Sequence, residues 1–194
     1  MRRVGGGRLG GRRLLSLPAS VRGVRPTGSR VREAIADRLQ RELPGAHVLD
    51  LFAGTGGLAI EVLSRGAASA VLVEQQPRVA RFLREQLTAL ELGAVARVVC
   101  ADARRYLEGS VVAPFELVLL DPPYDAEGAQ ALVSTVVAAL AGGGWLRDGA
   151  VVVHEYGRER GRGGVVRWPA GFQLERTRSY GQSAVDFLRW RGDP

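Results

Sequence analysis

The sequence predicts an α/β protein with a doubly wound, mostly parallel sheet of seven strands that ends in an antiparallel hairpin. From residue 47 onward, short apolar segments of strand length alternate with segments whose apolar residues repeat at helical spacing. A glycine-rich turn follows the first apolar segment, as is typical of such sheets. The last two segments of strand length are separated only by a short turn, which predicts the hairpin. Alternating strands and helices require crossovers, and therefore neighbouring strands that run parallel.

The expected elements follow in chain order. Near the N-terminus we expect a β-hairpin around residues 8–17, turning at the glycine pair 10–11, and then a helix over about 30–41 that Ser29 caps. Pro77 opens a helix whose apolar residues recur at helical spacing to about residue 90. Further helices are expected at 58–64 and 129–140, and strands at 48–52, 71–74, 97–100, 115–120, 150–156, 174–179 and 184–190.

The composition fits one domain with a modest extension, because 46% of the 194 residues are hydrophobic. The single cysteine, Cys100, excludes an internal disulfide, and its apolar strand context predicts a buried side chain. The apolar runs are far shorter than a membrane span. The arginine-rich start has too many glycines for a transit peptide and too short an apolar stretch for a secretory signal. We therefore expect a cytosolic protein without a membrane segment.

The positive charge is concentrated near the N-terminus. All 27 basic residues are arginine, which reflects residue usage rather than function. Residues 1–41, however, carry eleven arginines against Glu33 and Asp37, whereas the remaining residues carry 16 arginines against 18 acids. Charge concentrated in one segment indicates a polyanionic partner. We therefore divide the chain into a basic, RNA-binding extension over 1–41 and an α/β domain over 42–194.

The first motif is the glycine-rich turn between the first strand and the next helix. Residues 50–59 read Asp-Leu-Phe-Ala-Gly-Thr-Gly-Gly-Leu-Ala. Glycines allow a tight turn and the close approach of a ligand, and the following helix presents free N–H groups. Glu74 ends the second strand, where its carboxylate can accept hydrogen bonds from both hydroxyls of a ribose. The pair indicates a nucleotide-like cofactor and leaves a dinucleotide oxidoreductase open at this point.

The second motif, Asp121-Pro122-Pro123-Tyr124, follows the apolar strand over 115–120. It lies at the carboxyl edge, where open α/β sheets bind ligands. The Asp121 carboxylate and the Pro122 carbonyl can accept the two hydrogens of a planar amino group, which frees the nitrogen lone pair to attack an electrophile. Tyr124 can stack on the base that carries this amino group. The tetrad predicts methylation of an exocyclic amino group and disfavours the oxidoreductase.

The two motifs together resemble those of the class I S-adenosylmethionine-dependent methyltransferases of nucleic acids, which have a Rossmann-like fold. Nearly the whole chain is similar to the RsmD family, whose members methylate N2 of guanine 966 in 16S ribosomal RNA. The segments that carry this likeness are Arg12–Leu14, Arg25–Thr27, Arg30–Glu33, Leu63–Ala67 and Tyr180–Gly181. The resemblance implies that residues 42–194 form an S-adenosylmethionine-dependent rRNA (guanine-N2-)-methyltransferase domain. The chain departs from the family at Gly57, where alanine is usual and the change should be harmless, and at Gly28–Ser29, which replaces a hydroxyl–Asp pair.

The resemblance also implies roles for individual residues. The catalytic tetrad would be Asp121, Pro122, Pro123 and Tyr124. The cofactor would contact Asp50, Phe52, Gly54, Gly56, Glu74, Gln75, Asp102, Ala103 and Asp121. Asp102 serves equally well as a helix N-cap, and both roles are compatible. The RNA substrate would contact Arg8, Arg12, Arg13, Arg25, Thr27, Arg30 and Tyr124.

The expected reaction is a direct in-line methyl transfer without a metal, because His47 and His154 have no partners at ligand spacing. We expect a monomer that acts on ribosomal RNA within a small-subunit assembly intermediate. One alternative is an adenine-N6 or cytosine-N4 DNA methyltransferase, which can carry the same tetrad. The other is a ribosome-assembly or RNA-binding factor without activity. The tetrad alone leaves the identity of the target base open.

Overall fold

The computed structural model describes residues 2–18, 28–122, 128–157, 166 and 168–192. Its strands are β1 (His47–Asp50), β2 (Ser69–Glu74), β3 (Ala96–Cys100), β4 (Phe115–Leu120), β5 (Leu146–Gly157), β6 (Phe172–Tyr180) and β7 (Ser183–Trp190). Its helices are the 3-10 turn η1 (Gly7–Leu9), α1 (Ser29–Arg38), α2 (Gly57–Ser64), α3 (Pro77–Ala89), α4 (Ala103–Leu107) and α5 (Ala129–Gly142). Within these described ranges, no helix is both long and apolar enough to span a bilayer.

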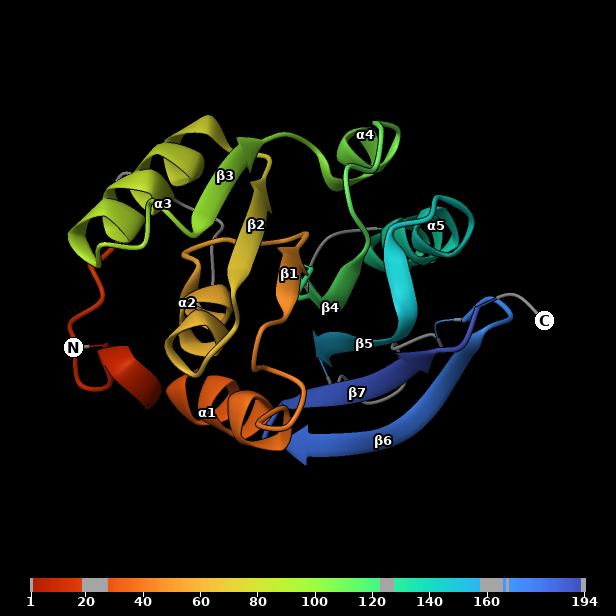
Figure 1. The fold of residues 1–194 in the computed structure, drawn as a ribbon, viewed down its shortest axis with the longest axis horizontal. Helices are drawn as coiled ribbons and strands as arrows, with labels where there is room; N and C mark the ends of the chain where they lie inside the picture. Colours follow the sequence, from red (N-terminus) through yellow and green to blue (C-terminus); the bar gives the residue numbers. More distant parts are fainter. Residues whose placement is uncertain (1, 19–27, 123–127, 158–165, 167, 193–194) are drawn as a thin grey trace.

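The strands form one sheet with helices on both of its sides (Figure 1). Among the described residues seven strands pair in the order β3-β2-β1-β4-β5-β7-β6. Strands β1 to β5 pair in parallel, whereas β7 runs antiparallel to both β5 and β6. The predicted α/β fold, its mostly parallel seven-stranded sheet and its closing hairpin are confirmed.

Two apolar cores lie on opposite faces of the sheet. Adjacent residues of a strand point to opposite faces, so in β1 Val48 packs with residues of α1, α2 and α3, whereas Leu49 packs with residues of α4 and α5. Strand β4 supplies both cores, with Leu117 and Leu119 on one side and Val118 and Leu120 on the other. The apolar run over residues 117–120 is therefore explained by burial on both faces.

The order of the strands reverses between β1 and β4. The chain proceeds outward from β1 to β3 and then returns to add β4 on the other side of β1. In open α/β sheets, such a reversal leaves a crevice at the carboxyl ends of the two strands. The pairing of Asp50 with Leu119 places the end of β1 beside the end of β4. The fold thus brings Asp50 of the first motif and Asp121 of the second to one edge.

The N-terminal hairpin predicted around residues 8–17 is wrong in register. The Val4 N–H donates to the Arg12 carbonyl and the Leu14 N–H donates to the Arg2 carbonyl, each at 3.0 Å. The paired arms are therefore residues 2–4 and 12–14, with η1 between them. Both Gly7 and Gly11 have a positive φ. Several glycines could form the turn, so the sequence pattern did not identify which of them does so.

Two smaller predictions are also wrong. Helix α1 begins at Ser29 itself, follows Gly28, and has no side-chain cap. Cys100 is exposed, because it is the last residue of β3 and β3 forms an edge of the sheet. An edge strand is covered less than a central one, which an apolar pattern does not reveal.

Candidate active site

Three carboxylates lie at the carboxyl edge of the sheet, on both sides of the reversal in strand order. Asp50 ends β1, Glu74 ends β2, and Asp121 directly follows β4. The side chains of Asp50 and Glu74 are buried, with exposed fractions of 3% and 8%, and Asp121 is partly buried. The structure therefore brings together the acidic residues of the two motifs, although they are separated by up to about seventy residues in the chain.

The electrostatics of this cluster favour a cationic ligand. Burial, together with the charges of Asp121 and Glu74, raises the pKa of Asp50 to about 8, although the backbone hydrogen bond from Phe52 opposes the shift. Burial also raises the pKa of Glu74, although backbone hydrogen bonds oppose that shift. Among the described residues, no arginine forms an ion pair with Asp50 or Glu74. A buried acidic cluster of this kind becomes fully charged most readily when a cation binds beside it.

Glu74 also shapes the glycine-rich loop. Its Oε2 accepts a hydrogen bond from the Gly54 N–H at 3.0 Å, and its Oε1 accepts one from the Gln76 N–H at 2.7 Å. Gly54 and Gly56 have φ angles of 51° and 74°, which favour glycine. A Cβ atom on Gly56 would lie 2.4 Å from Cδ1 of Leu83. The loop therefore requires glycine at position 56 for both its backbone conformation and its packing.

Asp102 caps helix α4, as one of its two predicted roles requires. Its carboxylate accepts hydrogen bonds from the Arg104 N–H at 2.9 Å and the Arg105 N–H at 3.4 Å. The hydrogen-bonded ion pair with Arg104 lowers the pKa of Asp102. Ala103, the first residue of α4, is buried. Both residues follow β3 at the same carboxyl edge as the acidic cluster.

The remaining residues of the expected cofactor and base site are placed as follows. Phe52 is partly buried, and its N–H donates to Oδ1 of Asp50 at 3.3 Å. Gln75 is exposed immediately beyond β2, and Pro122 is buried immediately beyond Asp121. Four predicted site residues lie outside the described part of the chain: Arg25, Thr27, Pro123 and Tyr124.

The arginines predicted to contact RNA fall into two groups. Arg8, Arg13 and Arg30 are exposed. Arg12 instead donates to the carbonyl groups of Ala89 and Leu90, at 3.0 and 3.4 Å. It therefore satisfies carbonyl groups at the end of helix α3, whereas the three exposed side chains are available to a ligand.

One buried polar side chain beside the loop was missed by sequence reasoning. Gln86 of α3 is 1% exposed and donates from Nε2 to the Thr55 carbonyl at 2.6 Å. A sequence signal did exist: position 86 falls on the apolar stripe that contains Val79, Phe82 and Leu83. A polar residue on such a stripe indicates a specific buried hydrogen bond.

The two histidines have structural surroundings. Nδ1 of His47 lies 2.7 Å from Oγ of Ser69. Burial lowers the pKa of His154 to about 4, and its ring packs against those of Tyr156 and Trp168. Across the described ranges, no three side chains of His, Cys, Asp or Glu gather as metal ligands would.

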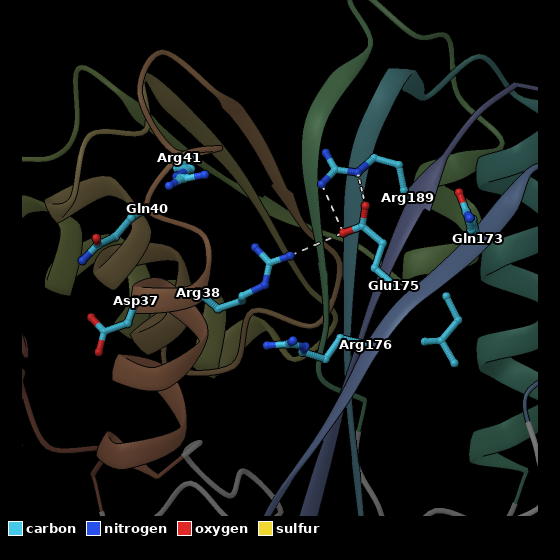
Figure 2. Close-up of a pocket in the computed structure, with 9 residues that line it drawn as sticks. Asp37, Arg38, Gln40, Arg41, Gln173, Glu175, Arg176 and Arg189 are labelled. Carbon is cyan, nitrogen blue, oxygen red and sulfur yellow. Dashed lines mark hydrogen bonds and ion pairs between the residues drawn. The ribbon is translucent and has the colours of Figure 1, made fainter.

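A polar hollow of about 750 Å³ lies elsewhere, between the end of α1 and the hairpin of β6 and β7. Figure 2 shows Arg38 and Arg189 both directed toward Glu175. Arg189 Nε donates to Glu175 at 2.7 Å, and Arg38 Nη2 at 3.5 Å. Arg189 pairs with Val151 of β5, which pairs in turn with Leu117 near the start of β4, so the hollow lies away from the carboxyl edge. Arg38 and Arg189 each form ion pairs with both Glu42 and Glu175, so acidic side chains of the protein itself already neutralise these two arginines.

Comparison with known proteins places the chain in a family. Residues 2–189 match the family described as "Conserved hypothetical protein 95". The chain is 37% identical over 182 residues to ribosomal RNA small subunit methyltransferase D of Escherichia coli, covering 94% of this chain and 86% of that protein. The protein of the same name from Haemophilus influenzae is 31% identical over 71% of this chain and 70% of its own length.

Solved structures agree with this assignment. An Escherichia coli structure with 33% sequence identity superposes with a TM-score of 0.84 and covers 98% of both chains. A Thermus thermophilus structure with 30% identity gives a TM-score of 0.73, over 96% of this chain and 98% of that one. The chain therefore belongs to the RsmD family and is a methyltransferase with a Rossmann-like fold.

Proposed function

We propose that the protein transfers a methyl group from S-adenosylmethionine to N2 of a guanine in small-subunit ribosomal RNA. The observation that carries this proposal is the gathering of Asp50, Glu74 and Asp121 at the reversal of strand order. The relatives named ribosomal RNA small subunit methyltransferase D support the class of substrate. We further propose a cytosolic monomer that acts on a small-subunit assembly intermediate.

The carboxyl edge fits S-adenosylmethionine, which would supply a methyl group bonded to a cationic sulfur. The fit rests on Asp50, whose burial and acidic neighbours raise its pKa to about 8. A cation beside Asp50 offsets the cost of its charge. Asp50 would hold the cationic methionine part with the loop at Gly54 and Gly56. Glu74 retains acceptor capacity for ribose hydroxyls beyond its two backbone hydrogen bonds, and Asp102 would accept from the adenine amino group.

Asp121 and Pro122 orient the target nitrogen in this mechanism. The Asp121 carboxylate accepts one hydrogen of the guanine amino group, and the Pro122 carbonyl accepts the other. These bonds direct the nitrogen lone pair toward the reactive carbon, and they strengthen as the nitrogen becomes positive. Alignment of this kind can contribute roughly 7–11 kcal/mol to lowering a barrier. The nitrogen–carbon bond forms as the carbon–sulfur bond breaks, and the nitrogen then releases its proton to solvent.

A labelled-methyl assay tests the class of reaction and substrate. The purified protein is incubated with S-adenosylmethionine labelled in its methyl group and with ribosomal RNA, transfer RNA or duplex DNA. The RNA and the ribosomal subunits come from a strain that lacks this methylation. We expect label in the small-subunit RNA only, and at least a hundredfold less transfer by Asp121→Asn, which keeps the shape of the side chain but not its charge. Label in DNA alone, or no label in any substrate, would overturn the proposal.

A further inference from the structure

The N-terminal segment, residues 2–15, is attached to the helix that the glycine-rich loop opens. Oε2 of Glu61 accepts a hydrogen bond from the Gly5 N–H, and Oγ of Ser64 accepts one from the Leu9 N–H, each at 2.9 Å. Both acceptor side chains belong to α2 and are buried. Helix α2 begins at Gly57, directly after the loop. The segment therefore packs against the element that positions the loop.

Both ends of the N-terminal segment are linked to Thr55 of the loop, one directly and the other through Gln86. The Leu14 N–H donates to the Arg2 carbonyl at 3.0 Å and so holds the two ends together. Nη1 of Arg2 lies 3.4 Å from Oγ1 of Thr55. At the other end, the Leu15 N–H donates to Oε1 of Gln86 at 2.7 Å. Nε2 of Gln86 donates in turn to the Thr55 carbonyl at 2.6 Å, which completes a link from segment to loop.

Gln86 is chemically suited to this link. The Leu15 N–H can only donate and the Thr55 carbonyl can only accept, so the connecting side chain must do both. A carboxamide meets this requirement, whereas a carboxylate cannot donate and an ammonium group cannot accept. Because Gln86 is 1% exposed, its own carboxamide has little access to water that could replace a lost bond.

We propose that Gln86 is a positioning residue that couples the N-terminal segment to the glycine-rich loop. Cofactor held by the loop and RNA held by the exposed Arg8 and Arg13 then favour the same placement of Thr55. Each ligand therefore tightens the binding of the other. By thermodynamic linkage, RNA lowers the Kd of the cofactor by the same factor by which the cofactor lowers the Kd of the RNA. The inference rests on the proposed function for the identity of the ligands. It assigns to Gln86 an effect on the binding of both ligands that requires no contact with either of them.

Calorimetry on the full chain tests this coupling. The Kd of S-adenosylmethionine is measured alone and with a saturating hairpin of small-subunit ribosomal RNA. For the wild type, we expect the RNA to lower this Kd by at least about fivefold. Gln86→Met removes both hydrogen bonds, and Gln86→Glu keeps the acceptor but loses the donor to Thr55. Both variants should show a ratio of the Kd without RNA to the Kd with RNA that is close to one, whereas Gln173→Glu, an exposed change on β6, should keep the wild-type ratio.

Hydrogen exchange gives a second reading that needs no RNA. Adding S-adenosylmethionine should slow exchange at the Leu15 amide in the wild type and leave it unchanged in Gln86→Met. A merely structural glutamine would lower stability in both states without changing this difference. Gln86→Glu, with nearly the same shape, serves if Gln86→Met does not fold.

The outcomes separate this inference from the proposed function. If a folded Gln86 variant keeps both the wild-type ratio of Kd values and the wild-type protection of the Leu15 amide, the coupling is overturned and the proposed function is not. The same holds if the wild-type protein binds both ligands independently. A wild-type protein that binds no S-adenosylmethionine, either alone or with the RNA, would overturn the proposed function, and the coupling with it.

Discussion

Asp50 makes the stability of the ligand-free protein depend on pH in the direction opposite to that of an ion-paired Asp. Burial and the neighbouring carboxylates raise the pKa of Asp50 from 3.8 to about 8. Because the folded pKa exceeds the unfolded one, the stabilisation is fully present below about pH 4 and is lost as the pH rises through 8. Asp50→Asn keeps the size of the side chain and its acceptor oxygen but removes the ionisation.

The magnitude follows from the shift in pKa. Each pH unit between the two pKa values changes the free energy of unfolding by about 1.4 kcal/mol, and the slope flattens near the folded pKa. From pH 5 to pH 8, the wild type should lose about 3.5 kcal/mol relative to Asp50→Asn. Asp121 and Glu74 belong to the same cluster, so part of the proton uptake is shared among the three carboxyl groups. The loss is large beside the roughly 5–15 kcal/mol that stabilises a typical domain.

Urea unfolding followed by circular dichroism measures this difference. Both proteins are unfolded without ligand at half-unit steps from pH 5 to pH 8. The reasoning would be refuted if the two plots of unfolding free energy against pH stay parallel, or if the wild type gains stability relative to the variant as the pH rises. Saturating S-adenosylmethionine should make the stability difference between the wild type and Asp50→Asn depend less on pH, because its positive charge favours the ionised form of Asp50.

Three further perturbations test separate parts of the site. Asp121→Ala should nearly abolish methyl transfer while leaving the calorimetric Kd of S-adenosylmethionine within a few-fold of the wild type, because the proposed mechanism uses Asp121 to hold the target amino group; retained turnover would remove it from the mechanism. Glu74→Gln should weaken cofactor binding at least about tenfold, since a hydrogen bond to a charged group contributes about 1.5–3 kcal/mol; an unchanged Kd would show that Glu74 only shapes the loop. The double change Arg8→Gln and Arg13→Gln should reduce the dependence of RNA affinity on salt. Measured by fluorescence anisotropy with a single-stranded RNA, the slope of log K against log salt should fall by about 1.4, at about 0.7 per phosphate contact. Arg12→Gln, at a side chain already bonded to α3, should leave this slope unchanged.

The sheet and the acidic cluster could be predicted because short-range patterns determine them. The alternation of apolar strands and helical stripes leads to a parallel sheet, and the carboxyl ends of its strands must share one edge. Asp50, Glu74 and Asp121 each stand at the end of an apolar strand in the sequence. Their meeting point therefore follows from topology alone.

The packing of the N-terminal segment could not be predicted in the same way. Residues 2–15 have no clear period, and their attachment depends on contacts with Glu61, Ser64 and Gln86, which lie more than fifty residues away in the chain. The short helix α4 was expected only through the capping role of Asp102. Local propensity carries no information about which distant polar side chains will satisfy a glycine-rich backbone.

Position 57 shows how packing refines an expectation based on resemblance. Glycine in place of the usual alanine was expected to be harmless. A Cβ atom at this position would lie 3.0 Å from Cδ of Arg32, a side chain that is 1% exposed. Nη2 of Arg32 donates to the Arg3 carbonyl at 3.1 Å, so Gly57 leaves room for a buried arginine that supports the N-terminal segment. Alanine at this position requires Arg32 to shift by a few tenths of an ångström.

Identification of the methylated nucleoside tests the central claim most directly. Small ribosomal subunits and their naked RNA, from a strain lacking the modification, are treated with the wild type and with Asp121→Asn. The RNA is then digested and analysed by mass spectrometry, and the modified position is mapped by primer extension. The account predicts one N2-methylguanosine in the small-subunit RNA with the wild type and almost none with the variant. A methylated adenine or cytosine would contradict the assignment of the base, and equal yields from both proteins would contradict the role of the carboxyl edge.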